Sequence, residues 1–494
     1  MLYRTFCEAA ARAPAAGVRQ DGQFRSYGEI AEHAGRIATG LLARGIEPGT
    51  PIGLLLPNGP DLLTLGYAIF AAGSIAVPLN PAAPVPELAA TARKAHIGAL
   101  IAAPAHAEAA GKLIEALAAD MPLFVTGDDG DHSIGALSRH PIGTLAETDG
   151  DTQALYLFSS GSTGIPKVVP HTQGELDLDS KGGRDRGQFL PSDLQINMLP
   201  GSHAMGFLYP IYMAIAGAST LYWSDPLPFA LSKARFARAI EAERATLVLG
   251  VPFIFDALST LRDEVDLSSI RTAMSSGVAL RHEIYEGFKQ RFGIKLRQGY
   301  GSTECLAIAM NMEPDPDTCW DSVGPPVPGL SWEIQPTDNP LGPQYGELVV
   351  SAPWVTKGYL DASETNASTI RNGKFHTGDL AGIGADGCLY LKGRIKLIIE
   401  IAGHKVDPME IEETLLQHPA VAEAVVVGIP DPRTGEQRLK AVIVRSAEES
   451  GDNLIRFCRE RLSSQKIPSV VEFRDEIPRS PAGKVLRGKL MEVA

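Results

Sequence analysis

Residues 159–167 read Ser-Ser-Gly-Ser-Thr-Gly-Ile-Pro-Lys, which places hydroxyl side chains, two glycines and one lysine in nine residues. The apolar run 154–158 comes directly before them and is short enough for a buried strand. Residues 168–172 return to strand character. Glycines allow positive φ and close backbone approach, so amide N–H groups in such a loop can face an anion. The stretch therefore predicts a phosphate-binding loop between two strands.

The same stretch permits two other interpretations. The phosphate loop of nucleotide hydrolases, G-x-x-x-x-G-K-[ST], does not fit, because the glycines are three apart and Pro166 precedes the lysine. Val168 also follows the lysine, where Ser or Thr would hold magnesium. A Gly/Ser linker stays open, although linkers seldom lie between two apolar strands.

Length and composition bound the class of protein. A chain of 494 residues is too long for one core and should form two or more domains. Its apolar content of 44% and charged content of 21% are ordinary for a folded protein. The net charge of −13 argues against a nucleic-acid partner and against an anionic membrane surface.

Cysteine usage and the apolar segments bear on location. The five cysteines lie far apart with no C-x-x-C pair, which predicts reduced thiols in a cytoplasmic protein. The N-terminus shows no signal-peptide pattern. The apolar segment 62–79 touches the lower limit for a membrane span, but Gly66 and Gly73 interrupt it. We expect a buried helix that leads into a strand, and no integral membrane segment.

Helix and strand patterns alternate in the first third of the chain. The spacing predicts a helix over 27–44 and strands at 51–56, 100–103 and 122–126, which indicates α/β layers with a largely parallel sheet. The basic, glycine-rich residues 181–186 are expected to form a solvated loop, with a contact to a phosphorylated cofactor as the alternative. Asp407-Pro408 predicts a helix start, and the pattern beyond it fits a small α+β domain.

Two later stretches carry further chemistry. Residues 298–304 read Gln-Gly-Tyr-Gly-Ser-Thr-Glu, where the tyrosine offers a flat face for a purine. Thr303 and Glu304 can hold Mg²⁺ against phosphate oxygens. Asp379 follows a glycine and can accept two hydrogen bonds from vicinal hydroxyls, as a ribose requires. A turn-capping aspartate is the plain alternative for Asp379.

Together these stretches resemble the motifs of the adenylate-forming (ANL) superfamily. This superfamily includes acyl- and aryl-CoA synthetases, adenylation domains of nonribosomal peptide synthetases and firefly luciferase. Motifs of this family occur in the family's order along essentially the whole chain. The resemblance implies an α/β fold: a large N-terminal domain of α/β layers with a distorted β-barrel, plus a small mobile α+β C-terminal domain. It places the N-terminal domain at 1–393, the hinge at 394–396 and the C-terminal domain at 397–494.

The resemblance also implies roles for individual residues. It assigns catalysis to Lys167, Thr303, Glu304 and Lys484, magnesium to Glu304 and the hinge pivot to Lys396. The positions implied for ATP are Ser159, Ser160, Gly161, Ser162, Thr163, Gly164, Lys167, Gln298, Gly299, Tyr300, Gly301, Ser302, Thr303, Asp379 and Arg394. The positions implied for the acyl substrate are His203, Met205, Gly206, Ser276, Gly277, Gly301 and Leu306.

The expected reaction is adenylation of a carboxylate by ATP with Mg²⁺, followed by transfer of the acyl group to the thiol of coenzyme A. Rotation about Lys396 would withdraw Lys484 between the two steps. The segments implied for the acyl pocket carry only His203 and Glu304 as ionisable groups, which favours a neutral apolar or aromatic acid. Two departures, Leu397 and Glu400, stand where synthetases carry acidic residues and lysine, and they weaken the expectation for the thioester step.

Several alternatives stay open. The acceptor could be the phosphopantetheine of an acyl carrier protein, or the enzyme could activate an unusual amino acid. A luciferase-like oxygenation of the adenylate and a nucleotide-binding regulatory protein without turnover are more distant. A monomer or homodimer is expected.

Overall fold

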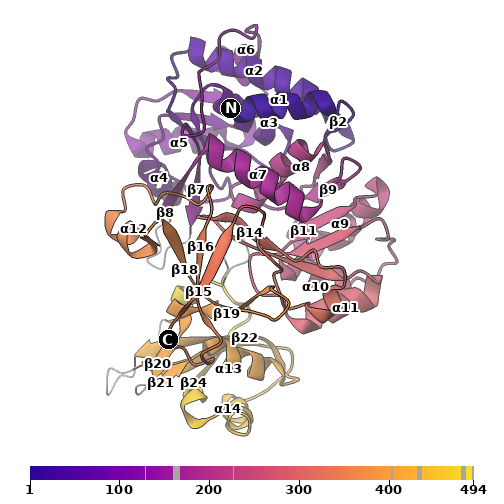
Figure 1. The fold of residues 1–494 in the computed structure, drawn as a ribbon, viewed down its shortest axis with the longest axis vertical. Coiled ribbons are helices and arrows are strands. Elements are labelled where there is room, and N and C mark those ends of the chain that lie inside the picture. The colour runs from indigo at the N-terminus through magenta and orange to yellow at the C-terminus, as the bar shows by residue number, and fades with distance from the viewer. Residues whose placement is uncertain are drawn as a thin grey trace. The chain divides into compact units, whose positions relative to one another are not determined.

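The computed structural model describes residues 1–127, 130–159, 167–225, 227–401, 404–430, 437–479 and 485–491. The chain forms two compact units. Unit 1 comprises Met1–Ser331 and Ser351–Phe375, and unit 2 comprises Trp332–Val350 and His376–Ala494. This mixed α/β architecture, with a large N-terminal and a small C-terminal part, confirms the predicted fold class (Figure 1). The domain bounds at 393 and 397, the mobility and the barrel stay predictions.

Unit 1 contains two mainly parallel sheets. The first has the order β6-β5-β3-β4-β7-β8, and only its β7–β8 pair is antiparallel. Its strands are β3 (Pro51–Leu55), β4 (Ile75–Pro78), β5 (Ala99–Ala102), β6 (Leu123–Val125), β7 (Gln153–Ser159) and β8 (Lys167–Thr172). The largely parallel sheet predicted from the alternating pattern is therefore confirmed.

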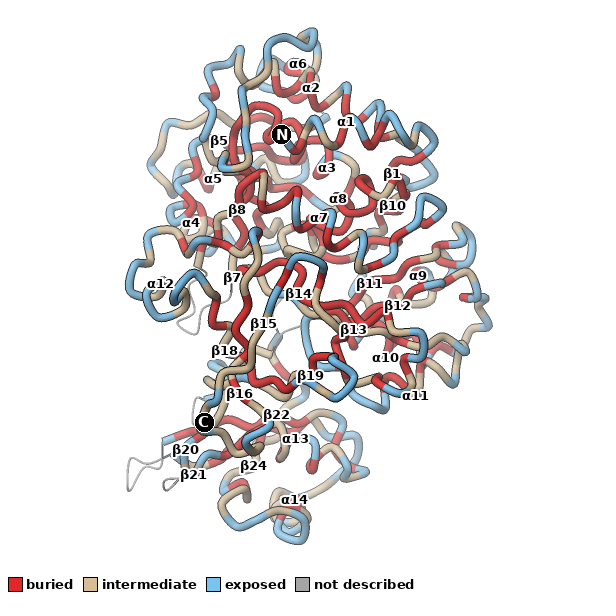
Figure 2. The backbone as a smooth tube through the Cα atoms, in the orientation of Figure 1, coloured by how far each residue is buried: buried red, intermediate tan, exposed pale blue. Residues whose placement is uncertain are grey.

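The second sheet has the order β14-β13-β12-β11-β9-β10-β1-β2, with antiparallel pairs only at its two ends. Its strands are β1 (Gly17–Gln20), β2 (Gln23–Ser26), β9 (Leu194–Asn197), β10 (Ser219–Tyr222), β11 (Leu247–Gly250), β12 (Thr272–Ser275), β13 (Leu296–Ser302) and β14 (Leu306–Met310). Strands β9, β11 and β12 and most of β10 are buried, as parallel strands covered on both faces must be (Figure 2).

Helices cover these sheets. They are α1 (Leu2–Arg12), α2 (Tyr27–Ala43), α3 (Pro60–Ala71), α4 (Val85–Lys94), α5 (Ala107–Leu117), α6 (Ile134–Ser138), α7 (Gln173–Gly187), α8 (Ala204–Ala216), α9 (Phe229–Glu243), α10 (Pro252–Ser259), α11 (His282–Phe292) and α12 (Ser363–Thr369). Segment 62–79 forms the buried α3 followed by β4, as predicted. Within the part of the chain that the structure describes, no helix combines the length and apolar character needed to cross a membrane.

The expectation of a solvated loop at 181–186 is wrong, because these residues lie inside α7. A β-carbon on Gly182 would lie 2.8 Å from Cγ1 of Val327, and one on Gly183 would lie 3.0 Å from the ring of Tyr212. The two glycines thus permit close packing of α7 and do not form a turn. Lys181 is held by Asp177 of the same helix at 2.6 Å.

Unit 2 contains most of one sheet of order β15-β16-β18-β17, with β19 paired to β18, and a smaller α+β part. The first group is β15 (Ser331–Pro336), β16 (Gly346–Ser351), β17 (Ile370–Arg371), β18 (Lys374–Ile383) and β19 (Leu389–Arg394). The second is β20 (Ile399–Ile401), β21 (His404–Val406), α13 (Pro408–Leu416), β22 (Val421–Pro430), β23 (Gln437–Arg445), α14 (Gly451–Arg459) and β24 (Val470–Phe473). Asp407 caps α13 by accepting the N–H of Met409 at 2.9 Å, as its position before proline predicts. The structure describes all five cysteines, and no disulfide joins them.

Candidate active site

The predicted phosphate loop connects two neighbouring antiparallel strands. Ser159 ends β7, Lys167 begins β8, and these two residues are direct partners in the strand register. The pairing brings the first hydroxyl and the lysine of the motif to one end of the sheet. The positions between them that were predicted to bind ATP lie outside the described residues: Ser160, Gly161, Ser162, Thr163 and Gly164.

The second motif is an extended strand with a bulge. Residues 298–302 complete β13, and the register of β13 with β14 shifts between Tyr300 and Gly301. A β-carbon on Gly301 would lie 2.2 Å from the carbonyl oxygen of Leu306, so this position requires glycine. The amide of Gln298 donates to the carbonyl of Trp320 at 2.8 Å, which ties the strand to its surroundings. Thr303 and Glu304 follow directly in the turn after β13.

A third segment, residues 356–360, joins these two motifs. The hydroxyl of Tyr359 donates to Oε1 of Glu304 at 2.8 Å, and Nζ of Lys167 lies 4.8 Å from the centroid of the Tyr359 ring. The N–H of Thr356 donates to the carbonyl of Glu304 at 2.9 Å. The structure therefore brings Lys167 and Glu304 to one side chain within unit 1.

Tyr359, Thr356 and His171 are contacts that the sequence did not predict. The ring nitrogen Nε2 of His171 lies 2.8 Å from the carbonyl oxygen of Thr303, which anchors the turn on β8. No local pattern signals that Tyr359 contacts a residue 55 positions away.

The donor set around Glu304 suits a magnesium ion that is also held by phosphates. Among the described residues, no group of three or more His, Cys, Asp or Glu side chains could form a metal site. Mg²⁺ bound with a nucleotide needs only one or two protein carboxylates besides phosphate oxygens and water. Glu304 is buried, at 9% exposure, and its hard oxygen donors fit this requirement.

Three of the segments implied for the acyl pocket lie against one another. His203 caps α8, with Nδ1 accepting the N–H of Met205 at 3.4 Å. A β-carbon on Gly277, where φ is +88°, would lie 3.6 Å from Cε of Met205. One on Gly299 would lie 3.7 Å from Cβ of Ser276. The start of α8, the loop after β12 and strand β13 thus meet.

Two further predicted substrate positions are constrained by the backbone. Gly206 is buried, and a β-carbon there would lie 2.1 Å from the carbonyl oxygen of Pro200. Leu306 adopts φ of +55°, which is unusual for a bulky residue, and is 4% exposed. Both positions are fixed by packing, and their contact with a substrate stays a prediction.

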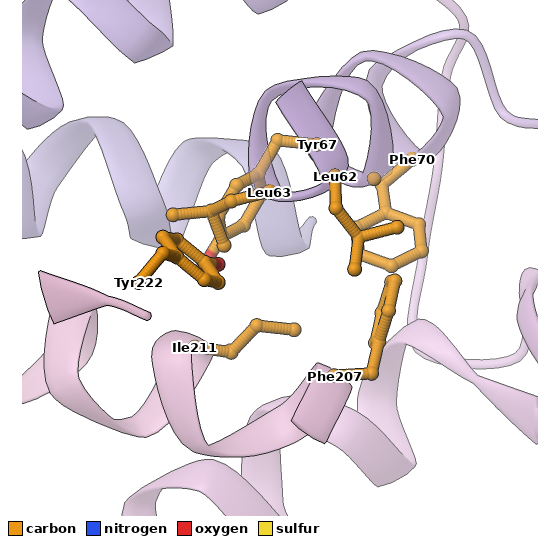
Figure 3. Close-up of a pocket in the computed structure, with 8 residues that line it drawn as sticks. Leu62, Leu63, Tyr67, Phe70, Phe207, Ile211 and Tyr222 are labelled. Atoms are coloured by element: carbon orange, nitrogen blue, oxygen red, sulfur yellow. The ribbon is translucent and has the colours of Figure 1, made fainter. Parts of the chain in front are cut away.

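The face of α8 that carries Phe207 and Ile211 borders a different, apolar pocket. Figure 3 shows these side chains with Leu62, Leu63, Tyr67 and Phe70 of α3 and with Tyr222. This pocket lies in the core between α3 and α8. Met205, at the start of the same helix, points its methyl group toward the space beside Gly277 instead, so only part of residues 203–209 is available to line an acyl site.

In unit 2, the two residues predicted near the ribose are paired with each other. Nε of Arg394 donates to Oδ1 of Asp379 at 2.6 Å, and the two residues are partners in the β18–β19 register. Asp379 is 6% exposed and follows Gly378, whose φ is +70°. Lys396 lies in a short 3₁₀ turn, Ile395–Leu397. Lys484 lies outside the described residues.

Comparison with known proteins identifies the family. The AMP-binding enzyme family matches residues 5–360, and its C-terminal domain matches residues 410–484. A feruloyl-CoA synthase from Amycolatopsis sp is 32% identical over 486 residues, covering 96% of this chain and 95% of the relative. A sulfoacetate–CoA ligase from Cupriavidus necator is 29% identical over 480 residues, covering 96% of this chain and 93% of that protein.

Solved structures agree with these matches. ATP-bound MatB from Rhodopseudomonas palustris has a TM-score of 0.87 at 26% identity, covering 99% of this chain and 98% of that one. A benzoate CoA ligase from Burkholderia xenovorans LB400 has a TM-score of 0.84 at 25% identity, covering 99% of each chain. The chain belongs to the family of AMP-binding enzymes.

Proposed function

We propose that the chain is an AMP-forming acid–thiol ligase that joins a neutral apolar or aromatic carboxylic acid to coenzyme A. A carboxylate oxygen attacks the α-phosphorus of ATP, and the bond from that phosphorus to pyrophosphate breaks. The thiol sulfur then attacks the acyl carbon of the adenylate, the bond to AMP breaks, and the thiol proton passes to solvent. Relatives over nearly the whole chain are named a CoA synthase, a CoA ligase and a putative acyl–CoA ligase, which supports this reaction.

The observation that carries the proposal is the convergence of Lys167 and Glu304 on Tyr359. Neutralising the charge of a polyphosphate needs cations. Lys167 supplies one at the end of the predicted phosphate-binding loop, and the buried carboxylate of Glu304 can hold a second one, a metal ion. Mg²⁺, held by Glu304, would supply a counter-charge for the phosphate oxygens. Lys167 and the hydroxyls of the predicted phosphate-binding loop would bind the departing pyrophosphate, and Thr303 would orient a phosphate.

Other residues would position the two substrates. Asp379 would accept the ribose hydroxyls, with Arg394 holding its carboxylate at 2.6 Å, and Tyr300 would stack on adenine. His203 accepts a hydrogen bond at Nδ1, which assigns the proton of its neutral ring to Nε2 and makes that atom a donor suited to a carboxylate. Lys484 would bridge the carboxylate and the α-phosphate.

The relatives differ in their acids, so the residues of this chain carry the inference about its class of acid. One is named for ferulate and another for sulfoacetate, a dianion. A second negative charge on the acid would need a cationic partner, and residues 203–209, 275–280 and 299–308, the segments implied for the acyl pocket, carry no lysine or arginine. A neutral apolar or aromatic side chain suits such a lining.

A carrier protein is the second candidate acceptor. Glu400 is exposed on the β20–β21 hairpin, opposite Lys405. A negative charge here disfavours the phosphates of free coenzyme A, while a carrier protein could present the same thiol.

The test is release of AMP and pyrophosphate from Mg·ATP with a panel of aliphatic, aromatic, amino and dicarboxylic acids, with and without coenzyme A. Turnover on one neutral acid that rises sharply with coenzyme A is expected. Pyrophosphate release that ignores coenzyme A would favour the carrier protein, and no release with any acid would overturn the ligase. Lys484→Ala should abolish adenylation while ATP binding is largely kept, and turnover that survives this substitution would contradict the role of Lys484.

A further inference from the structure

We infer that Tyr359 is a positioning residue that holds Glu304 and Lys167 in place for Mg·ATP. The inference rests on the proposed function, because it assigns Tyr359 a task at the same nucleotide site. The phenol of Tyr359 contacts Glu304 through its hydroxyl and Lys167 through its ring. The hydroxyl donates a hydrogen bond to Oε1 of Glu304 at 2.8 Å, and the ammonium of Lys167 lies 4.8 Å from the ring centroid.

The backbone around Tyr359 fixes its side chain. The N–H of Tyr359 donates to Oδ1 of Asn366 at 2.7 Å, and Nδ2 of Asn366 donates back to the carbonyl of Tyr359 at 2.8 Å. Before Tyr359, Oγ1 of Thr356 donates to the carbonyl of Pro170 at 2.9 Å. After it, the N–H of Leu360 donates to the carbonyl of Val168 at 3.0 Å. The segment is thus bound to both α12 and β8, and Tyr359 is 8% exposed.

The hydroxyl satisfies one oxygen of a buried carboxylate. A carboxylate as buried as Glu304 needs hydrogen-bond donors, and each donor narrows the orientations that it can take. With Oε1 engaged by the phenol, Oε2 is the oxygen that Glu304 would offer to a metal. Groups that orient a metal ligand in this way typically contribute a factor of 10–100 to metal affinity.

The ring has a separate effect on Lys167. An ammonium over a tyrosine face is attracted by the negative face of the ring. This contact places the charge of Lys167 beside the carboxylate site without requiring an ion pair with Glu304. The hydroxyl and the ring therefore act on the metal and on the phosphates respectively, and two substitutions separate them.

Tyr359→Phe removes the hydroxyl and keeps the ring. We expect the affinity of the enzyme–nucleotide complex for Mn²⁺ to fall roughly 10- to 100-fold, measured by electron paramagnetic resonance with an ATP analogue bearing an α,β-methylene bridge. Binding of metal-free ATP, measured calorimetrically in a chelator, should stay at the parental value. Tyr359→Leu should weaken both, because Lys167 also loses the ring.

Tyr285→Phe is the matched control. Tyr285 is another buried tyrosine of unit 1 whose hydroxyl donates to a carboxylate, Asp317 Oδ1, at 2.5 Å. This variant should leave Mn²⁺ affinity unchanged. Parental Mn²⁺ affinity in Tyr359→Phe, with or without a loss of thermal stability, would make Tyr359 a structural residue only and overturn the inference.

A double-mutant cycle with Glu304→Gln tests whether the effect passes through Glu304. In that background, Tyr359→Phe should cause no further loss of Mn²⁺ affinity. An additive loss would overturn the inference as well. Failure of the proposed function is distinguishable, because the parent protein would then bind the nucleotide and Mn²⁺ without releasing pyrophosphate on any acid.

Discussion

The backbone N–H of Ala307 donates a hydrogen bond to Oδ1 of Asp179 at 3.0 Å, across 128 positions of the sequence. Asp179 lies in α7 and is fully buried, and its Oδ2 accepts the hydroxyl of Tyr212 from α8. One carboxylate thereby joins α7 and α8 to the start of β14. Ala307 follows Leu306, so this bond also fixes the unusual backbone beside the candidate acyl site.

Asp179→Asn should change how stability depends on pH. Burial raises the pKa of Asp179 to about 6, whereas the unfolded chain titrates near the ordinary value of about 3.9. Between these values the folded state binds more protons, so the stabilising contribution of Asp179 is complete below about pH 4 and is lost as pH rises through about 6. The asparagine side chain does not titrate in this pH range. The stability of the variant relative to the parent should therefore rise from pH 4 to 6 and stay level above.

Urea unfolding at pH 4.5, 5.5 and 7 measures this difference. Asp317→Asn is the control, because hydrogen bonds from Lys289, Lys295 and Tyr285 lower the pKa of Asp317 below its usual range. Its contribution is present above the unfolded pKa and is lost only as pH falls, so its relative stability should stay flat across the same interval. A flat profile for Asp179→Asn would show that Asp179 is ionised throughout.

Gly183→Ala in α7 should destabilise the protein, whereas Gly111→Ala in α5 should stabilise it. A β-carbon at 183 would lie 3.0 Å from the ring of Tyr212, but one at 111 meets nothing within 4 Å. Overpacking typically costs about 1–3 kcal/mol, and removing glycine from an open helical position gains about 0.5–1 kcal/mol. Thermal unfolding of both variants checks the pair. Equal shifts for the two would mean that Tyr212 moves aside.

Two segments, strand β7 and helix α7, show where local sequence patterns predict the structure and where they do not. The apolar run 154–158 predicts β7 correctly, because strand formation there follows a local pattern. The solvated loop predicted at residues 181–186 is wrong. Glycine is a local turn signal, but the two glycines here lie in a helix and allow close packing against Val327 and Tyr212. Tertiary packing, and not the local glycine pattern, therefore determines the structure of residues 181–186.

The site divides in the same way. Lys167 and Glu304 could be named as candidates from the sequence, since a cation and a carboxylate within glycine-rich motifs have evident phosphate and metal chemistry, and their roles stay predictions. The contacts of Tyr359 could not be predicted, because its two partners are distant in sequence and no local pattern around Tyr359 points to them.

Met205→Ala should widen the range of acids accepted. The methyl group of Met205 lies 3.6 Å from where a β-carbon of Gly277 would be, so truncation opens space between α8 and the loop after β12. Relative kcat/KM for a larger aromatic acid over benzoate should rise about tenfold or more, the scale that apolar pocket contacts provide. Met205→Leu is the control of similar volume. An unchanged ratio in steady-state assays would place Met205 outside the acyl site.

Arg487→Lys should separate the two half-reactions. Nη1 and Nη2 of Arg487 donate to the two oxygens of Glu412 at 2.7 and 3.1 Å, and Nη1 also donates to the carbonyl of Val426 at 2.6 Å. Lysine cannot reproduce this paired contact. Arg487 follows the predicted catalytic Lys484 by three residues, so loosening this anchor should misplace the lysine. Displacement by about 1 Å can cost up to roughly 100-fold in rate.

The measurement compares pyrophosphate exchange with thioester formation from supplied acyl-adenylate. Exchange should fall strongly in Arg487→Lys, while thioester formation should be largely kept, because Lys484 is assigned to adenylation alone. Lys466→Met is the control, since it breaks another ion pair to α13, Lys466–Glu410 at 2.6 Å. Equal losses in both half-reactions, or the same pattern in Lys466→Met, would mean that the Arg487–Glu412 pair stabilises unit 2 without orienting Lys484.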